Sequence, residues 1–242
     1  MARIGRDSAA RVVDRHLRLR ETLRGPAPAT RWDPDAKPPV PGAYVAISRH
    51  HYCQASLISA EVAGRLGYTL YDRELLEAVA EDARLRTQLI ERLDERHLTD
   101  IDGMISSIIN PSSSAHAEYT RSLIRVLRSL GEVGDMVVVG RGAHLILPPD
   151  RGLRVHLVAP MAKRLDRFRE QTGIDERQAP GRLRELDRSS ENWLKRTFPT
   201  PDGVDPLYDL ELNTDSYSVE ESADLIVRAL WAKCPESRPE EA

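Results

Sequence analysis

The sequence is short of cysteine, of aromatic residues and of long apolar runs. Its 242 residues include two cysteines, Cys53 and Cys234, too few for a framework of several disulfides, which fits a reducing cytoplasm. No apolar run reaches the roughly 18 residues of a membrane-spanning helix, and the N-terminus lacks the hydrophobic segment of a signal peptide. These absences predict a cytoplasmic protein without a membrane partner.

An excess of charge of one sign is also missing. The chain has 35 Lys and Arg against 38 Asp and Glu, for a net charge of -3, which gives no global reason to expect a nucleic-acid partner. At 40% hydrophobic and 30% charged residues it can bury a sizeable core. The length allows one large domain or two small ones.

The first 40 residues differ from the remainder. Residues 1–24 contain seven arginines and place Val12, His16 and Leu19 on one side at helical spacing, and residues 24–42 are rich in proline. We predict a charged helix and a linker over residues 1–40, dispensable for folding of a domain over residues 41–242. The helix could contact a second copy or another protein, and a nucleic-acid or membrane arm is the alternative.

From residue 44 onward, apolar β-rich runs alternate with helical patterns. Helices are expected over residues 73–83 and 85–97, and a mobile loop over residues 102–116, which contain Pro111 and a serine run. The alternation predicts an α/β fold of three layers, α/β/α, around a five-stranded parallel sheet. The five strands are expected at residues 44–48, 68–72, 135–140, 153–160 and 208–214.

Ligands of parallel sheets bind beyond the carboxyl ends of the strands. In this chain that edge is expected to carry residues 48–56, Asp72, residues 140–144 and residues 213–214.

The turn after the first strand, residues 50–55, lies where nucleotide-binding proteins place a glycine-rich phosphate loop. It contains no glycine and no lysine. A residue with a β-carbon at a left-handed position costs about 1–2 kcal/mol, and a missing lysine removes a charged hydrogen bond worth roughly 1.5–3 kcal/mol. We therefore expect an ordinary strand-to-helix turn that does not wrap a triphosphate, although its free N–H groups could hold one small anion.

Three stretches together resemble one family. These are "YVAISRHHYCQASLISAEVAGRLGYTLYDRELLEAVA", "VVVGRGAHLIL", and "LDRSSENWLKRTF" with the later "YDLELNT" and a Ser-x-Glu-Glu helix. They are similar, in order and spacing, to the cytidylate-kinase-like family of P-loop proteins, over residues 44–233. The resemblance implies a nucleoside monophosphate kinase fold with a helical lid, ATP and magnesium as possible cofactors, and a pyrimidine monophosphate as a possible acceptor.

The resemblance also implies roles for individual residues. Where the family carries Gly-Ser-Gly-Gly this chain has residues 52–55, a degenerate phosphate loop, and Ala55 falls on the phosphate-gripping lysine. Ser56 falls on the serine that holds magnesium. The nucleotide-phosphate group comprises Ser48, Arg49, Gln54, Ala55 and Ser56.

The acceptor site implied by the resemblance comprises Asp72, Gly140, Arg141 and Gly142, with Arg141 and the lid residue Arg188 as catalytic cations. Alternatives stay open for neighbouring residues. Asp72 could instead cap the following helix, and His144 could be structural. Arg164 and Arg167 could pair with Asp166 and Glu170 on their own helix.

Two functions follow from these residues. One is a nucleotide-binding or phosphate-binding protein with weak or absent phosphoryl transfer, and the alternative is an active ATP-dependent kinase of the CMP or dCMP type. Zinc is not expected, because His50, His51 and Cys53 lack a fourth ligand at suitable spacing. A Ser-His-Asp hydrolase has no glycine-flanked serine to support it.

Overall fold

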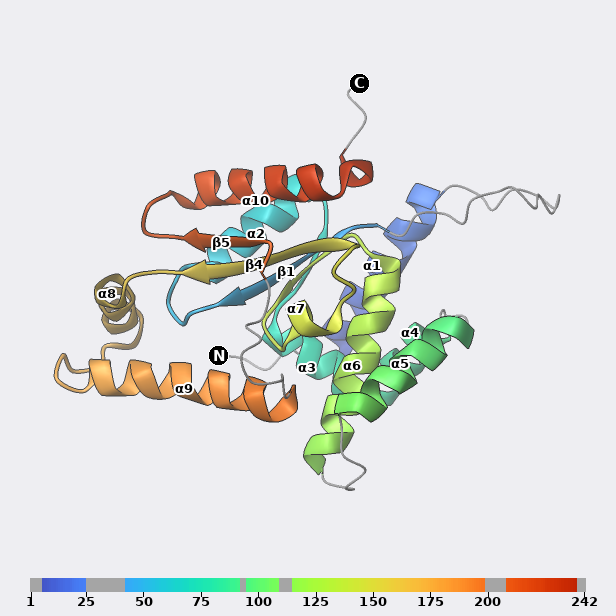
Figure 1. The fold of residues 1–242 in the computed structure, drawn as a ribbon, viewed down its shortest axis with the longest axis horizontal. Coiled ribbons are helices and arrows are strands. Elements are labelled where there is room, and N and C mark those ends of the chain that lie inside the picture. Colours follow the sequence, from blue (N-terminus) through green and yellow to red (C-terminus); the bar gives the residue numbers. More distant parts are fainter. Residues whose placement is uncertain (1–5, 25–41, 92–94, 109–114, 199–207, 239–242) are drawn as a thin grey trace.

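Five parallel strands form the centre of the computed structural model, which describes residues 6–24, 42–91, 95–108, 115–198 and 208–238 (Figure 1). Their order across the sheet is β2-β3-β1-β4-β5. The register aligns Tyr44 of β1 with Met136 of β3 and with Gly152 of β4. The strands are β1 (Tyr44–Arg49), β2 (Thr69–Tyr71), β3 (Met136–Val139), β4 (Gly152–Val158) and β5 (Leu210–Asn213).

Alternating residues of β1 divide the core into two layers. Tyr44 and Ala46 belong to the cluster on one face of the sheet, and Val45 and Ile47 belong to the cluster on the other face. Successive side chains of a strand point to opposite faces, so an unbroken apolar strand needs cover on both. The sequence-based expectation of an α/β/α fold with a parallel sheet is confirmed.

Helices cover the two faces unequally (Figure 1). One face carries α2 (Ala55–Leu66) and α10 (Val219–Lys233), and α10 is followed by a 3-10 turn at Pro235–Ser237. The other face carries α1 (Arg6–Arg24), α3 (Arg73–Glu81), α4 (Ala83–Ile90), α5 (Glu95–Ile108), α6 (Ala115–Val133) and α7 (Ala143–Ile146).

Two further helices form the predicted lid at the carboxyl end of the sheet. They are α8 (Met161–Thr172) and α9 (Ala179–Thr197), which pack through a small apolar cluster of Phe168, Ala179 and Leu183. Tyr52, from the turn after β1, packs against Phe168 with ring centroids 4.7 Å apart. The lid therefore packs directly on the turn after β1, residues 50–55.

Two predicted helix ends are confirmed. Gly67 ends α2 with a φ of 66°, a left-handed conformation that glycine adopts without steric cost. Ser218 and Glu221 form the predicted capping box of α10. Cys53 and Cys234 are both free and buried. Within the described ranges, no helix combines the length and the apolar character needed to cross a bilayer.

Two helix boundaries differ from the prediction. The break between the helices expected at residues 73–83 and 85–97 falls at Asp82, which caps α4 through the backbone N–H groups of Arg84 and Leu85, and α4 ends at Ile90. The expected loop over residues 102–116 is helical up to Ile108, because Ile101 and Ile105 are buried one turn apart. Residues 109–114, which include Pro111, lie outside the described residues.

The N-terminal helix packs into the same core as the sheet, in a part of the chain that was expected to be dispensable for folding. Ala9, Val13 and Leu17 are at most 2% exposed and belong to the same cluster as Tyr44. His16 lies 2.9 Å from both the Tyr71 hydroxyl and the Gly134 carbonyl. The buried face is shifted from the predicted one, since Leu19 is 42% exposed. The apolar side of α1 thus packs on its own chain, and the linker lies outside the described residues.

Candidate ligand-binding cleft

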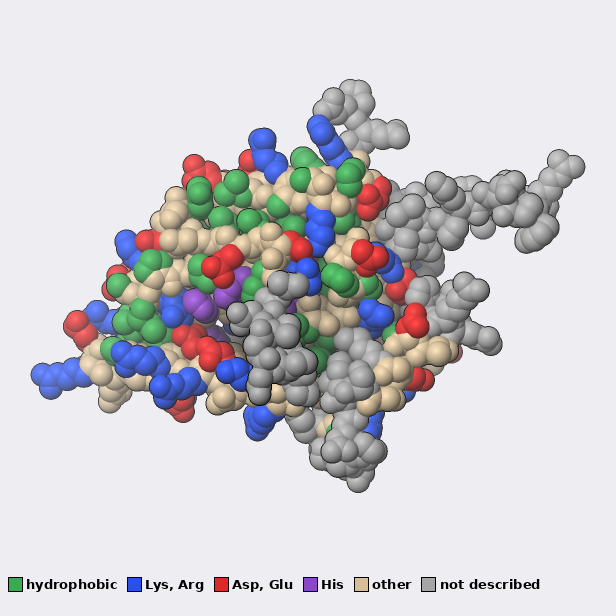
Figure 2. All heavy atoms as spheres, viewed as in Figure 1, with side chains coloured by type: hydrophobic (Ala, Val, Ile, Leu, Met, Phe, Trp, Pro, Cys, Tyr) green, Lys and Arg blue, Asp and Glu red, His purple; other side chains and the backbone are tan. Residues whose placement is uncertain are grey.

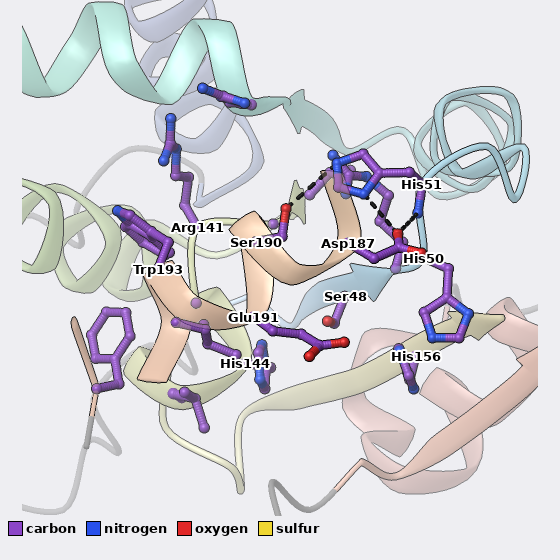
Figure 3. A pocket seen from close by; sticks show the side chains of 18 of the residues that line it. Ser48, His50, His51, Arg141, His144, His156, Asp187, Ser190, Glu191 and Trp193 are labelled. Carbon is purple, nitrogen blue, oxygen red and sulfur yellow. Dashed lines mark hydrogen bonds and ion pairs between the residues drawn. The ribbon is translucent and has the colours of Figure 1, made fainter. Parts of the chain in front are cut away.

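A cleft of about 510 Å³ opens where the carboxyl ends of β1, β3 and β4 meet α9 of the lid (Figure 3). A volume of this size accommodates a mononucleotide-sized ligand. Figure 2 shows histidine side chains reaching the surface on this side of the molecule. Of the residues implied by the family resemblance, the cleft is lined by Ser48, Arg49, Gly140, Arg141 and Gly142.

Two arginines of the cleft share one carboxylate. Arg141 contacts Glu77, and the same carboxylate accepts a hydrogen bond of 3.0 Å from Arg73 Nε. Arg49 also lines the cleft and makes no ion pair with any described residue. Three guanidinium groups against one carboxylate leave an excess of positive charge at this end of the cleft.

Arg141 is held in a strained and partly dehydrated position. Its φ of 52° lies between those of Gly140 at 78° and Gly142 at 69°, so three consecutive residues are left-handed. The guanidinium lies 5.1 Å from the centroid of Trp193, and its Nε is buried without a hydrogen-bond partner. Burial, followed by the neighbouring Arg73 and Arg49, lowers the pKa of Arg141 to about 10. An anion would relieve this repulsion.

The opposite wall of the cleft is built from stacked imidazole and phenol rings. His156 stacks on Tyr208 at 4.6 Å, and His144 lies 5.0 Å from the same ring with its Nε2 3.3 Å from the tyrosine hydroxyl. Burial, then His156 and Arg154, lower the pKa of His144 to about 4, so it is neutral at pH 7. This burial and the contact with Tyr208 are compatible with a structural role for His144, which also lines the cleft.

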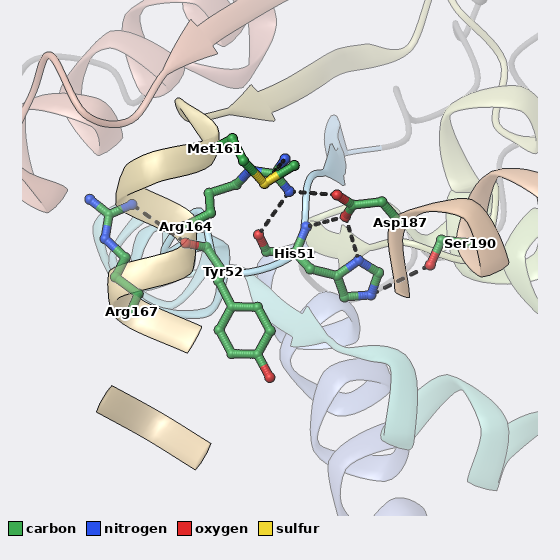
Figure 4. A network of polar contacts seen from close by, with 7 residues as sticks. All are labelled: His51, Tyr52, Met161, Arg164, Arg167, Asp187 and Ser190. Atoms are coloured by element: carbon green, nitrogen blue, oxygen red, sulfur yellow. Dashed lines mark hydrogen bonds and ion pairs between the residues drawn. The ribbon is translucent and has the colours of Figure 1, made fainter. Parts of the chain in front are cut away.

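A polar network ties the lid to the turn after β1 (Figure 4). The Asp187 carboxylate of α9 accepts from the His51 backbone N–H at 3.4 Å, from His51 Nδ1 at 3.0 Å and from Arg164 Nη1 at 2.7 Å. Arg167 donates to the Tyr52 carbonyl at 3.4 Å. Burial raises the pKa of Asp187, but the bonds from His51 and Arg164 outweigh it and lower the pKa to about 2.

The turn itself keeps an unusual backbone. Tyr52 and Gln54 have φ values of 61° and 62°, which corrects the expectation of an ordinary strand-to-helix turn. Such positions cost about 1–3 kcal/mol each and persist where the surroundings enforce them. Here Tyr52 is fixed by Phe168 and Arg167, and Cys53 is fully buried beneath it.

Several residues assigned from the sequence lie elsewhere. Gln54, Ala55 and Ser56 are not among the residues that line the cleft, and Ser56 is exposed on α2. Asp72 accepts a 2.8 Å bond from the Leu75 N–H, so it has the alternative role of a helix cap. Arg188 is exposed on α9 and does not line the cleft, so its position does not support a catalytic role.

Arg164 and Arg167 pair with other elements and not with Asp166 and Glu170, the alternative left open by the sequence. Arg164 pairs with Asp187, and Arg167 pairs with Asp215 at 3.7 Å, because both arginines face the turn and the end of β5 rather than their own helix.

Sequence reasoning missed the residues of α9 that face the cleft. Asp187, Ser190, Glu191 and Leu194 all line it. Their spacing of three and four residues places them on one face of a helix, while Arg188 lies on another. The spacing of these four residues can be read from the sequence, but the prediction for α9 was based on its arginines, and Arg188 lies on another face. Arg73 was likewise overlooked in favour of its neighbour Asp72.

Metal-ligand chemistry finds no support in the cleft. Over the ranges of the chain that the structure describes, no three histidine, cysteine, aspartate or glutamate side chains gather in a way that could hold a metal ion. Hydrogen bonds and ring stacking occupy the cleft histidines instead: His51 bonds to Asp187, and His156 bonds to Glu211 at 2.9 Å.

The five parallel strands with helices on both faces define an α/β fold, and the cleft lies at the carboxyl end of its sheet. A family model described as the cytidylate kinase-like family matches residues 44–216, and the chain belongs to that family. The match begins at β1 and ends just beyond β5, so it includes the cleft but not α1.

Three individual relatives are at most 30% identical to this chain. A cytidylate kinase from Methanopyrus kandleri is 27% identical over 148 residues, 56% of this chain and 75% of its own. A uronate isomerase from Corynebacterium glutamicum is 30% identical over 137 residues, 56% of this chain, and this chain spans only 26% of that protein's length. A solved structure of an uncharacterized protein from Eubacterium ventriosum has a TM-score of 0.55 at 21% identity, covering 77% of this chain and 96% of its own.

Proposed function

We propose that the protein binds a nucleoside monophosphate, or a similar phosphate ester, with the phosphate on Arg49, Arg73 and Arg141. The observation that carries the proposal is a group of three guanidinium groups in the cleft, of which Arg73 and Arg141 share one carboxylate, Glu77, and Arg49 has no ion pair among the described residues. Arginine binds phosphate oxygens through paired N–H groups, and such charge-assisted bonds are stronger than neutral ones. A dianionic phosphate matches the excess of positive charge.

The remainder of the cleft suits a sugar or base. His156 and Tyr208 present stacked rings, and Ser48 hydrogen-bonds to the Tyr208 hydroxyl. Flat ligands pack well on such rings, and the nearby hydroxyl and imidazole groups can bond to ring nitrogens and sugar oxygens. CMP and dCMP are the first ligands to test, because one relative is a cytidylate kinase.

Phosphoryl transfer from ATP is proposed to be weak or absent. A triphosphate needs a cation and free N–H groups at the turn, yet Ala55 supplies no charge and the Asp187 carboxylate already accepts from the His51 N–H. A phosphate placed there would meet a carboxylate of the same sign. The turn in this arrangement does not fit a magnesium-bound triphosphate.

The alternative is an active kinase of the CMP or dCMP type. One observation favours it: Tyr52 and Gln54 keep left-handed backbone at the cost of strain, as a phosphate loop does. If Asp187 moved away with the lid, the N–H of His51 would be available. The alternative then requires that ATP itself displace a charged side chain.

Calorimetric titration separates the two functions. CMP, dCMP, inorganic phosphate, ATP and CTP are titrated with and without magnesium, and ADP formation is followed by a coupled assay. The proposal expects monophosphate binding that is independent of magnesium, and turnover far below the roughly 1–100 s⁻¹ of ordinary kinases. Turnover in that range would establish the alternative, and the absence of any monophosphate or phosphate binding would remove the proposed function.

A further inference from the structure

Three side chains of the cleft lie in the order carboxylate, imidazole, hydroxyl. Asp187 Oδ1 is 3.0 Å from His51 Nδ1, and His51 Nε2 is 3.5 Å from Ser190 Oγ (Figure 4). All three residues line the same cleft, and their side chains converge there in Figure 3. They come from two separate segments, the turn after β1 and helix α9, so no local sequence motif announces them.

The carboxylate fixes the state of the imidazole. Burial raises the pKa of Asp187, but the hydrogen bonds from His51 and Arg164 outweigh it and lower the pKa to about 2, so the carboxylate is ionised and can only accept hydrogen bonds. His51 must therefore carry a proton on Nδ1. In the neutral imidazole, Nε2 then bears the lone pair and faces Ser190, which is the tautomer that a general base requires.

Ser190 is available to be activated. It is exposed on the face of α9 toward the cleft, and its hydroxyl has His51 Nε2 as its one hydrogen-bond partner among the described residues. A distance of 3.5 Å is long, but nucleophile–base contacts are commonly loose before substrate binds. Asp187 and Ser190 are three residues apart, so one helical face presents both ends of the set.

A positive group for a developing oxyanion lies nearby. Arg49 lines the cleft, has no ion pair among the described residues and is close enough to Asp187 for their charges to interact. Its neighbours Arg73 and Arg141 extend the positive region toward the other end of the cleft. A guanidinium in this place can stabilise an alkoxide in the way that N–H donors of an oxyanion hole do.

We propose that Ser190, His51 and Asp187 form a nucleophilic triad that hydrolyses carboxylic esters bearing a phosphate or other dianionic group. The proposal goes beyond phosphate binding, and it rests on the proposed function only for the anionic part of the substrate. Arg73 and Arg141 hold the anion, Arg49 faces the ester carbonyl, and Ser190 attacks it.

The reaction needs water as its only co-reactant. Ser190 Oγ forms a bond to the carbonyl carbon while its proton passes to His51 Nε2; the bond to the leaving alkoxide then breaks, and that oxygen takes the proton from His51. Water, deprotonated by His51, attacks the acyl-serine, and the carboxylic acid leaves as Ser190 regains the proton. The sum is ester plus water giving acid plus alcohol.

Covalent labelling of the full chain with diisopropyl fluorophosphate tests the nucleophile without involving the arginines. The serine oxygen replaces fluoride on phosphorus, and peptide mass spectrometry locates the adduct. We expect one adduct, at Ser190, which is lost in Ser190→Ala and kept in the matched control Ser189→Ala. Asp187→Asn should slow labelling at least about 100-fold, because loss of the orienting carboxylate costs about 10⁴ in established triads.

Ester hydrolysis supplies the second readout. The cleavage of 4-nitrophenyl phosphonoacetate should exceed that of 4-nitrophenyl acetate at least about tenfold in kcat/KM, and Ser190→Ala should abolish both reactions while melting like the wild type. Absence of the Ser190 adduct, or equal hydrolysis by Ser190→Ala, overturns the triad even if phosphate still binds. Labelling at Ser190 without any phosphate binding would instead leave the triad standing and remove the proposed function.

Discussion

The cleft and the adjoining turn after β1 differ in whether their cations and hydrogen-bond donors are already paired with a carboxylate. In the cleft, Arg73 and Arg141 share one carboxylate, Arg49 has no ion pair among the described residues, and the buried Nε of Arg141 has no hydrogen-bond partner. At the turn, a carboxylate of the chain already binds the positive groups, because Asp187 accepts hydrogen bonds from His51 and Arg164. One region has cations in excess, and the other is already neutralised.

This difference shows why a strand-to-helix turn alone does not identify a phosphate site. Backbone shape is retained at Tyr52 and Gln54, but the N–H of His51 is engaged by a carboxylate. Whether a phosphate can bind depends on the balance of charges and on unsatisfied donors, both of which favour the arginine end of the cleft.

The largest expected effect concerns α1, the helix that packs into the core next to β2 and β3. Removal of residues 1–24 deletes the buried Val13 and Leu17 and the His16 bonds to Tyr71 and Gly134, which lie next to β2 and β3. Burial of each large side chain contributes about 1.5–3 kcal/mol, so the truncated protein should lose several kcal/mol of a typical total of 5–15 kcal/mol. Urea unfolding measures the loss.

Point substitutions keep this prediction testable if the truncated protein fails to fold. Leu17→Ala should lower the free energy of unfolding by about 2–5 kcal/mol, whereas Leu19→Ala, at a position 42% exposed, should change it by less than about 0.5 kcal/mol. A truncated protein with an unchanged cooperative melt would show that α1 adds nothing to the core.

The next effect tests the arginine side of the comparison. Arg141→Ala should weaken binding of inorganic phosphate or CMP by about 10–100-fold, because a charged hydrogen bond is worth roughly 1.5–3 kcal/mol. Arg188→Ala removes an exposed arginine outside the cleft and should change affinity less than about twofold. Calorimetric titration of the two variants decides the matter, and equal effects would mean that general positive charge attracts the ligand.

The smallest effect tests the turn. The pKa of Asp187 is lowered from 3.8 to about 2, so its bonds stabilise the folded state fully above pH 4, and that contribution is lost as the pH falls from about 4 to 2. In Asp187→Asn, the part of the unfolding free energy that this carboxylate loses in acid should be missing. The pKa of Asp209 is also lowered to about 2, because burial raises it less than the hydrogen bonds from Arg154 and Lys233 lower it. The variant Asp209→Asn is therefore a matched comparison.

Urea unfolding between pH 5 and pH 2 checks this last prediction. The unfolding free energy of Asp187→Asn should fall less steeply with acid than that of the wild type. Parallel curves for the two proteins would show that the carboxylate is not held by His51 and Arg164 in solution.

The fold could be predicted from the sequence because its determinants are local and redundant. Residues 44–47 are apolar on both faces, and Gly67 and Ser218 mark helix ends in the expected way. Errors arose where tertiary packing decided the outcome. Leu17 rather than Leu19 was buried, and Ile101 and Ile105 extended α5 into a stretch with weak helical signals.

The cleft was predicted only in part. Arg49 and Arg141 were expected at the ligand edge of the sheet because Arg49 ends β1 and Arg141 comes shortly after β3. His51 and Ser190 could not be paired from sequence, since they are 139 residues apart and meet only when the lid packs on the turn. A long-range contact of this kind leaves no trace in local spacing.

The location of a bound dianion tests the central claim most directly. Crystals grown with selenate, a mimic of phosphate, reveal the anion by its anomalous scattering. The account predicts a peak among the guanidinium groups of Arg49, Arg73 and Arg141, with Asp187 still bonded to His51. A peak at the N-terminus of α2 with Asp187 turned away, or a cleft without selenate, would contradict it.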